Sequence, residues 1–126
     1  MNPLTDIMQK AVSGMSVQTK RIGVTSENIS NADTPGYKRK MVIPDAQIDP
    51  SGFRDALIKL DQTAGETSFD PTHPMADAEG YVTGSNVSLV IEMADMREAN
   101  RMYEANLNAF QQARTMYKSL LDVIRR

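Results

Sequence analysis

The chain has 126 residues, a length typical of one domain, and no cysteine, which excludes disulfides and thiolate metal sites. The net charge of −2 is uneven, because residues 41–87 carry eight acidic and two basic side chains while residues 1–40 carry three acidic and six basic ones. No segment is basic enough to indicate nucleic-acid binding. No apolar run reaches the roughly 18 residues of a membrane-spanning helix, and the first residues do not resemble a signal peptide, so we expect no cleaved leader.

Proline limits where long helices can form. The six prolines stand at positions 3, 35, 44, 50, 71 and 74. Because an internal proline breaks a helix, long helices are predicted only within residues 3–34 and 75–126. The expected plan is a helix, a turn-rich middle and a second helix.

The first predicted helix starts with Asn2 as N-cap and Pro3 at the first helical position. Gly14 and Gly23 each weaken it by about 1 kcal/mol relative to alanine, so we expect it to form only against a partner. Its apolar residues recur at spacings of three and four, which indicates a coiled-coil seam that also admits two polar members. The seam consists of Leu4, Met8, Ala11, Met15, Gln18, Ile22, Thr25, Ile29 and Ala32.

Three short strands are expected in the middle of the chain. Residues 37–43 alternate in polarity and would place Tyr37, Met41 and Ile43 on one face of the first strand. Residues 56–60 and 67–69 are the other two candidates, and together they would make a small hairpin-like element. The basic residues Lys38 to Lys40 are predicted to guard an exposed strand edge against aggregation.

The second predicted helix begins after Ser88 as N-cap and continues without glycine or proline to the end of the chain. A helix of this extent is about 55 Å long, which greatly exceeds the usual length in globular proteins. Arg125 and Arg126 stand at its negative dipole end. Its heptad seam consists of Met96, Ala99, Tyr103, Asn106, Phe110, Ala113, Tyr117, Leu120 and Ile124.

The shared period predicts that the two helices pair with each other. The expected fold is mainly α, with residues 1–34 and 88–126 packed as one antiparallel-type coiled-coil domain and residues 35–87 forming a small β-rich segment. A two-helix pair has no interior for a second apolar face, so we expect other subunits to bury the apolar residues that lie off the second seam. These are Leu89, Val90, Ile91, Met93, Met102, Leu107, Met116, Leu121 and Val123.

No pattern indicates catalysis or a cofactor. Asp70, His73, Asp77 and Glu79 cluster in sequence, but Pro74 prevents the helix that would bring the histidine and Asp77 to one face, and there is no second histidine to complete a zinc set. No serine lies in a nucleophile elbow, and no glycine-rich loop precedes a helix. We therefore expect no enzyme activity, no metal, no cofactor and no small-molecule substrate.

The stretch NISNADTPGYK, residues 28–38, reads as the exit from the first helix. Asn28 and Asn31 are placed to offer side-chain amides to carbonyls at the helix end. Pro35 biases the residue before it away from helix, and Pro-Gly suits a type II turn with positive φ at Gly36. A turn followed by a strand is the expected outcome.

Here the sequence resembles a known family. TSENISNADTPGYK is similar to the signature of flagellar axial proteins, the rod, hook and hook-associated subunits, through Asn28, Ile29, Asn31, Thr34, Pro35, Gly36 and Tyr37. Residues 70–110 resemble the C-terminal half of proximal rod proteins, in which a P-x-A-D-x-x-G-Y-V turn precedes N-V, E-M and R-x-Y-x-A-N. The matching positions are Pro74, Ala76, Asp77, Gly80, Tyr81, Val82, Asn86, Val87, Glu92, Met93, Arg101, Tyr103, Ala105 and Asn106.

The resemblance implies a structural subunit of the flagellar basal-body rod. Such a chain would leave the cell unfolded through the flagellar type III apparatus and polymerise with copies of itself and other rod proteins into an axial tube across the periplasm. Both ends of the isolated chain would then be disordered until neighbours pack on them. The resemblance fits either of two sister proximal-rod proteins, and the ADAEGYV turn, residues 76–82, favours one of them. The alternative is a cytoplasmic helical adaptor or chaperone, because such a protein would show the same heptads. It would need neither the turn at the exit of the first helix nor the ADAEGYV turn.

Overall fold

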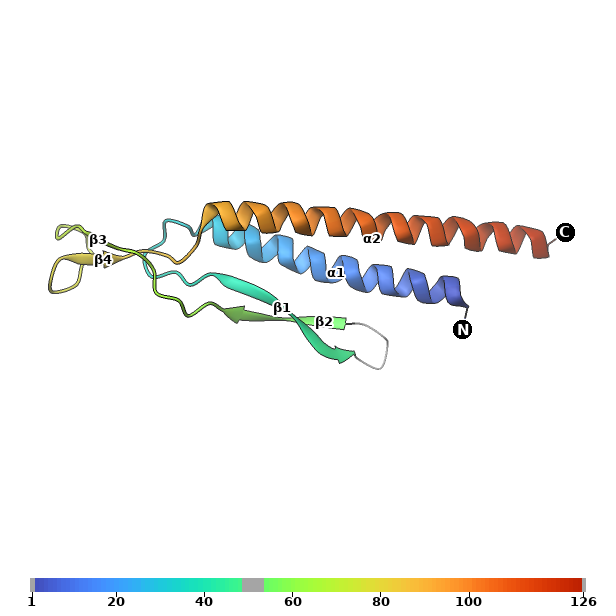
Figure 1. Cartoon of the computed structure of the whole chain (residues 1–126), viewed down its shortest axis with the longest axis horizontal. Helices are drawn as coiled ribbons and strands as arrows, with labels where there is room; N and C mark the ends of the chain where they lie inside the picture. Colours follow the sequence, from blue (N-terminus) through green and yellow to red (C-terminus); the bar gives the residue numbers. More distant parts are fainter. Residues whose placement is uncertain (1, 49–53, 126) are drawn as a thin grey trace.

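The computed structural model describes residues 2–48 and 54–125 and is an elongated molecule with both chain ends at one end and a small β-hairpin at the other (Figure 1). Two long helices run side by side, and a longer β-hairpin lies along one of them. The elements in chain order are α1 (Pro3–Ser30), β1 (Lys40–Ile48), β2 (Arg54–Leu60), β3 (Thr67–Phe69), β4 (Tyr81–Thr83) and α2 (Leu89–Ile124). The mainly helical fold class predicted from the heptads is therefore confirmed.

Helix α1 starts and ends through asparagine side chains. Asn2 occupies the N-cap, and its Oδ1 accepts a hydrogen bond from the Leu4 N–H at 2.9 Å, with proline at the first helical position. The helix ends at Ser30, four residues before the predicted limit, and Asn31 caps it by donating from Nδ2 to the Glu27 carbonyl at 2.9 Å. The predicted amide contact to a helix-end carbonyl is thus made by Asn31, whereas the prediction was wrong for Asn28, whose Nδ2 donates to the Lys40 carbonyl instead.

Helix α2 has 36 residues and is about 54 Å long. Ser88 occupies the predicted N-cap position, but its side chain makes no capping hydrogen bond. Of the four residues that follow, only Glu92 is buried, whereas Leu89, Val90 and Ile91 are exposed. No helix within the described parts of the chain combines the length and apolarity needed to cross a membrane.

The two helices pack antiparallel in one register. Facing residues have numbers that add to 120, as for Asn28 with Glu92 and for Gly14 with Asn106. A Cβ added to Gly14 would lie 2.7 Å from Nδ2 of Asn106, so the Asn106 side chain occupies the space that a side chain at position 14 would need. The fully buried apolar residues of this seam are small, namely Ala11, Ala99 and Ala113, whereas its large apolar residues are only half-buried.

Helix α2 extends beyond α1. In the register above Pro3 faces Tyr117, and the cap at Asn2 fixes the start of α1 at this point. Residues 118–125 therefore have no α1 residue opposite them, and we call this segment the overhang. At 1.5 Å per residue it is about 12 Å long.

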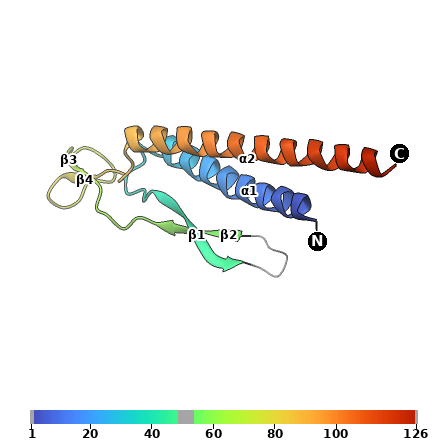
Figure 2. The same cartoon turned by 45° about the vertical axis from the view of Figure 1, so that its right-hand side comes forward.

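The β1–β2 hairpin lies along α1 on the side away from α2 (Figures 1 and 2). Its strands are antiparallel, with Lys40 opposite Leu60 and a register shift between Pro44 and Ile48. Lys20 of α1 donates from Nζ to the Ala56 carbonyl at 2.7 Å, which ties the hairpin to the helix. The predicted first strand began at Tyr37, but pairing with β2 begins at residue 40, because Tyr37 and Arg39 hydrogen-bond through their backbones to Asn86 instead.

The β3–β4 hairpin forms the end of the molecule opposite the chain termini. The prediction of a strand at residues 67–69 is confirmed, whereas the pairing partner, Tyr81–Thr83, was expected to be only a turn. Gly80 has φ +87°, which only glycine adopts readily, and the rings of Phe69 and Tyr81 meet edge to face at 5.3 Å. We call residues 62–84, which contain this hairpin and its loops, the head.

The molecule has a thin core and a large surface. Its accessible surface is 8972 Å², whereas a compact protein of 14.0 kDa would expose about 6,700 Å². The buried apolar residues among those described are all small: Ala11, Val24, Ala56, Val82, Ala99 and Ala113. Most large apolar side chains therefore stay at least partly exposed in the single chain.

Candidate functional site

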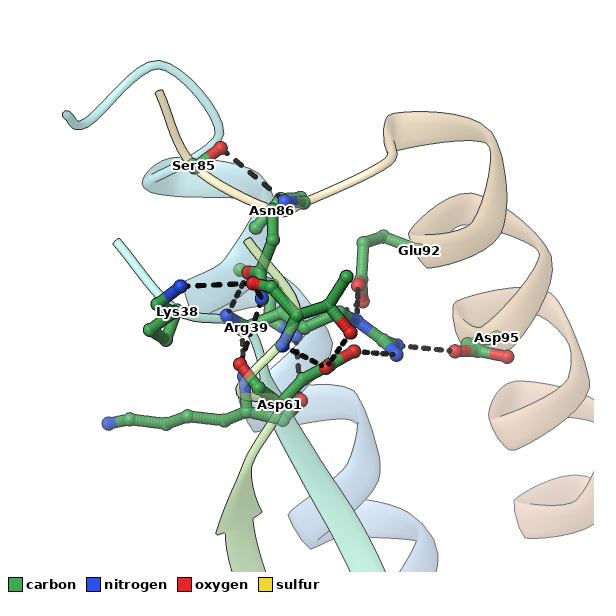
Figure 3. A network of polar contacts seen from close by, with 11 residues as sticks. Lys38, Arg39, Asp61, Ser85, Asn86, Glu92 and Asp95 are labelled. Atoms are coloured by element: carbon green, nitrogen blue, oxygen red, sulfur yellow. Dashed lines mark hydrogen bonds and ion pairs between the residues drawn. The ribbon is translucent and has the colours of Figure 1, made fainter. Parts of the chain in front are cut away.

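A buried polar junction forms where the end of α1, the start of β1, the end of β2 and the start of α2 meet (Figure 3). Its side chains come from segments far apart in sequence, and several of them belong to the family signature. The junction consists of Asn28, Tyr37, Arg39, Lys40, Asp61, Asn86, Glu92 and Asp95.

Asn28 lies at the centre of the junction and is 1% exposed. Its Oδ1 accepts hydrogen bonds from the backbone N–H of Lys40 and from the hydroxyl of Tyr37, both at 2.9 Å. Its Nδ2 donates to the Lys40 carbonyl at 2.9 Å and to Oε2 of Glu92 at 3.2 Å. The amide uses its full capacity of two donors and two acceptor sites. One side chain of α1 thereby holds β1, the exit turn and α2.

Glu92 is the second buried member, also 1% exposed. Its Oε1 accepts from Nε of Arg39 at 2.8 Å, so the carboxylate is paired with a cation as well as hydrogen-bonded to Asn28. Arg39 also approaches Asp95 at 3.4 Å and Asp61 at 3.8 Å (Figure 3). A buried carboxylate without such partners would be strongly destabilising. The guanidinium therefore joins β1 to β2 and α2.

Asn86 extends the junction to the linker that precedes α2. Its Oδ1 accepts from the backbone N–H of Arg39 at 2.6 Å, and its Nδ2 donates to the carbonyls of Asp61 at 2.8 Å and Thr63 at 3.0 Å. Its own N–H donates to the Tyr37 carbonyl at 3.3 Å. Asn86 thus joins the end of β2 to the segment before β1 through hydrogen bonds like those that a neighbouring strand would make.

The exit turn has the geometry expected from Pro-Gly. The Tyr37 N–H donates to the Thr34 carbonyl at 3.2 Å, and Gly36 has φ +74°. The Gly36 N–H donates to the Thr83 carbonyl at 3.1 Å, and the Ser85 hydroxyl bonds to the Ala32 carbonyl. The turn after α1 is thereby fastened to the base of the head.

Three groups of the junction have shifted pKa values. Burial, followed by the Glu27 carboxylate, raises the pKa of Tyr37 above 10.0. The hydrogen bond to Glu27, at 2.6 Å, raises the pKa of Lys40. Hydrogen bonds from the hydroxyl and N–H of Thr63 hold the pKa of Asp61 below its usual value, with a smaller contribution from Arg39.

The other predicted motif residues lie in two places. Asp77, Gly80 and Tyr81 shape the turn of the head, where Oδ1 of Asp77 accepts from the N–H groups of Glu79 and Tyr81, each at 2.9 Å. Tyr103 and Asn106 lie on α2 and are half-buried, more than two helical turns from Glu92. The family signature therefore spans the junction, the head and the helix seam rather than one site.

The predicted seam residues divide according to the overhang. Those within reach of the opposite helix are half-buried, namely Leu4, Met8, Met15, Ile22 and Ile29 on α1 and Met96, Tyr103, Phe110 and Tyr117 on α2. Leu120 and Ile124 belong to the overhang and are 46% and 71% exposed. The seam pattern on α2 thus continues past the point where α1 begins.

Sequence reasoning missed part of the junction. Arg39 and Lys40 were expected at an exposed strand edge, but both are half-buried and ion-paired. Glu92 stands at seam spacing, four residues before Met96, and a charge at a seam position was the signal for a buried partner. Nothing in the sequence around Asp61 indicated its place in the junction.

The residues that the sequence suggested as possible metal ligands do not come together. No group of three or more His, Cys, Asp or Glu within residues 2–48 and 54–125 is placed to hold a metal. His73 serves its own turn, since its Nδ1 accepts from the Met75 N–H at 3.0 Å. An open hollow of about 670 Å³ lies between the exit turn and the head, and small and polar residues such as Asp33 and Ser85 line most of it.

Comparison with known proteins places these features in a family. The family model described as "Flagella basal body rod protein" matches residues 8–38, which contain most of α1 and the exit turn. The model described as "Flagellar basal body rod FlgEFG protein C-terminal" matches residues 78–123, which contain β4 and most of α2.

Curated relatives cover nearly the full chain and are named flagellar basal-body rod protein FlgC. The relative from Agrobacterium fabrum is 41% identical, over 99% of this chain and 98% of its own. The relatives from Salmonella typhimurium and Bacillus subtilis are each 31% identical, over 95% and 90% of this chain and 97% and 93% of their own. Of the two sister proximal-rod proteins that the sequence left open, FlgC and FlgB, these relatives carry the first name. The chain belongs to the FlgC family of flagellar basal-body rod proteins.

Proposed function

We propose that this chain is a structural subunit of the flagellar basal-body rod and that it polymerises through its terminal helices. The observation that carries the proposal is the unsatisfied apolar surface of α2 in a chain whose relatives are rod proteins. The surface is large, because α1 covers only one face of the longer helix.

The outer faces of α2 fit burial by neighbouring subunits. Large apolar residues outside the α1 contact are exposed along its whole length, and Val90 is 79% exposed. Patches of this kind mark protein–protein contacts in soluble proteins. The residues are Leu89, Val90, Ile91, Met93, Met116 and Val123.

The junction supports this role by fixing geometry. A subunit of a helical array must present the same surfaces in every copy, because the same contacts repeat around the axis. Asn28 and Arg39 connect α1, α2 and the β1–β2 hairpin to one another. They therefore fix the angle between the helix pair and the hairpin. We assign the junction a positioning role in assembly and no catalytic one.

The proposal also names the neighbouring proteins, the export route and the place of the rod in the cell envelope. The neighbours would be copies of this chain and the other rod proteins FlgB, FlgF, FlgG and FliE, reached after export through the flagellar type III apparatus. The rod would stand in the basal body across the periplasm, transmit torque and let exported subunits pass. The proposal needs no enzyme activity, cofactor, nucleic acid or small-molecule substrate.

The test is deletion of the gene, with complementation by the wild-type chain and by the Asn28→Ala variant. We expect the deletion to abolish motility and basal-body assembly, the wild type to restore both, and the variant to restore them poorly. Normal basal bodies without the chain would overturn the proposal.

Circular dichroism separates a rod subunit from a helical adaptor. An adaptor would be fully helical as a dilute monomer. A rod subunit is expected to have largely disordered terminal segments, because Gly14 and Gly23 weaken α1 and the seam buries little apolar area. A rigid, fully helical and non-polymerising monomer would favour the adaptor.

A further inference from the structure

The β1–β2 hairpin has little to stabilise it on its own. It is a two-stranded sheet, and an isolated pair of strands is only marginally stable in water. Of the side chains described on its strands, only Ala56 is buried, whereas Leu57 and Ile58 are 57% and 50% exposed. The hairpin therefore depends on contacts with the rest of the molecule.

The segment that starts the hairpin is held by asparagine side chains from the ends of both helices. The Lys40 N–H donates at 2.9 Å to Oδ1 of Asn28, which lies in the last turn of α1. The N–H of Arg39 donates at 2.6 Å to Oδ1 of Asn86, which stands in the linker just before α2. Two successive backbone donors thus depend on the end of α1 and on the approach to α2.

Asn86 also completes the first pair of residues between the two strands. The Asp61 N–H donates to the Arg39 carbonyl at 2.9 Å, in register with Lys40 opposite Leu60. In a regular antiparallel pair, the Arg39 N–H would donate to the Asp61 carbonyl in return. The amide of Asn86 instead accepts from that N–H and donates from Nδ2 to that carbonyl at 2.8 Å. The strand pair therefore takes two of its first hydrogen bonds from the linker to α2.

The side chain of Arg39 connects the same point to α2 itself. The hairpin lies on the side of α1 away from α2 (Figures 1 and 2), yet the guanidinium reaches Glu92 at 2.8 Å and Asp95 at 3.4 Å. Glu92 is 1% exposed, and a buried carboxylate is tolerated only with such partners. Its other partner is Asn28 of α1. The contacts that start the hairpin thus require α1 and α2 to lie side by side.

We propose that the hairpin forms only after the two helices have paired, because pairing brings together the groups that start it. A chain with unpaired helices has no ordered hairpin under this proposal, whereas paired helices can exist without the hairpin. The seam allows the second state, since Ala113 is buried between the helices about 30 Å along α2 from the junction.

This order has a consequence for a rod subunit, and the consequence rests on the proposed function. If the terminal helices become ordered during assembly, the hairpin becomes ordered at the same place and time. An unpaired strand edge is a template on which other chains can pair. A subunit would then present that edge only after its helices had paired in the rod.

Hydrogen exchange of the purified full chain, read by mass spectrometry of its peptides, tests the order. The osmolyte trimethylamine N-oxide is added in steps to favour the folded state. Residues 40–43 and 56–60 report on the hairpin, and residues 20–28 and 96–103 report on the helix pair. We expect no step at which the hairpin is protected and the helix pair is not. A protected hairpin beside unprotected helices would overturn the proposal.

A substitution in the seam separates the helices without touching the hairpin. Ala99→Asp places a carboxylate at a position that is 0% exposed, so we expect the hairpin to exchange as fast as an unfolded chain. The matched control is Ala105→Asp, at an exposed position of α2, which should leave both parts protected. A hairpin that stays protected in the Ala99→Asp chain after the helices lose protection would contradict the proposal.

A substitution in the linker distinguishes an ordered sequence from a single cooperative unit. Asn86→Ala removes the bonds that start the hairpin, and we expect the hairpin to exchange about tenfold faster while the helix pair keeps its protection. The control Asn108→Ala, at an exposed position of α2, should change neither part. Equal acceleration of both parts by Asn86→Ala would mean that they unfold together, and the proposed order would be wrong.

These outcomes are separate from those that test the rod function. The exchange measurements use the free chain, so a wrong order of folding leaves the rod role standing. Absence of the chain from basal bodies would remove the rod role and the consequence for assembly, but not the coupling between helices and hairpin.

Discussion

Asn28 pairs with Lys40 as one strand pairs with another. Its side-chain Oδ1 accepts from the Lys40 N–H and its Nδ2 donates to the Lys40 carbonyl, both at 2.9 Å. The amide thus supplies the backbone-like partner that the first residue of β1 would otherwise lack on this side. Because Nδ2 also reaches Glu92, the start of the hairpin and the start of α2 depend on the same group.

Replacing Asn28 with alanine should therefore be costly. The change leaves the Lys40 N–H and carbonyl, the Tyr37 hydroxyl and a buried carboxylate short of partners, and we expect a loss of about 3 kcal/mol. The urea concentration that releases the chain from isolated basal bodies measures the loss. Asn31→Ala is the control, because that amide caps an exposed helix end and should cost less than about 1 kcal/mol. Equal effects would contradict the central place of Asn28.

The pair of Arg39 and Glu92 predicts a partial rescue. Arg39→Met leaves a carboxylate that is 1% exposed without its cation, and we expect a loss of about 3–5 kcal/mol by the same urea measurement. Adding Glu92→Gln removes the charge while an amide keeps the contact with Asn28, so the double variant should be more stable than the single one. A double variant that is less stable than Arg39→Met would count against a buried unpaired charge as the cause.

Two glycines of α1 should respond in opposite directions to alanine. Gly23→Ala meets no atom within 4 Å and should increase helix stability by about 1 kcal/mol. Gly14→Ala places a Cβ 2.7 Å from the Asn106 side chain and should be destabilising by about 1–3 kcal/mol, because that side chain must move. Adding Asn106→Ala to the Gly14→Ala variant should recover the lost stability. Helix content and thermal midpoint by circular dichroism of the assembled protein would show the difference in sign.

Alkaline pH should weaken the junction. The pKa of Tyr37 is raised above 10.0 and that of Lys40 above 10.5, so the folded state holds protons that the unfolded state releases. Their contributions are complete below these ordinary values and are lost as pH rises from them through the raised folded-state values. Tyr37→Phe removes one of the two groups, so release of this variant from basal bodies should depend less steeply on pH above about 10 than that of the wild type. Identical pH profiles would exclude Tyr37 as the sensitive group.

Acid should act through a different residue. The folded-state pKa of Asp61 is lowered from 3.8, so its contribution is present above that value and disappears as pH falls through the lowered one. Asp61→Asn should show a shallower loss of stability on acidification than the wild type, measured by release from basal bodies. Thr63→Val, which removes the hydroxyl hydrogen bond, should change the profile in the same direction.

Elements with a sequence period were predictable, and contacts across the chain were not. The heptads predicted both helices and their pairing because a helix repeats its buried face every three to four residues. The Pro35–Gly36 turn followed from the backbone each residue allows. Strand β4 was missed because three residues are too few to show alternation.

The junction could be anticipated only in part. Asn28 and Asn86 were chosen through the family signature, but their partners on β1 and β2 depend on how the hairpin folds back along α1. Lys40 was taken for an exposed strand edge because its sequence context shows only a charge run, whereas its backbone meets Asn28 and its side chain meets Glu27. Such pairings are set by three-dimensional approach and leave no local pattern.

The small residues of the helix seam carry a consequence for how the two ends of the chain find each other. The buried alanines Ala11, Ala99 and Ala113 would tolerate sliding, since one methyl group resembles another. The buried amide does not: a slide by one heptad that brings Asn28 opposite Ala99 would leave it facing a methyl group and would separate it from Glu92. Shifted alignments of the two helices are therefore higher in free energy. The helix pair adopts one alignment although its seam buries little apolar surface.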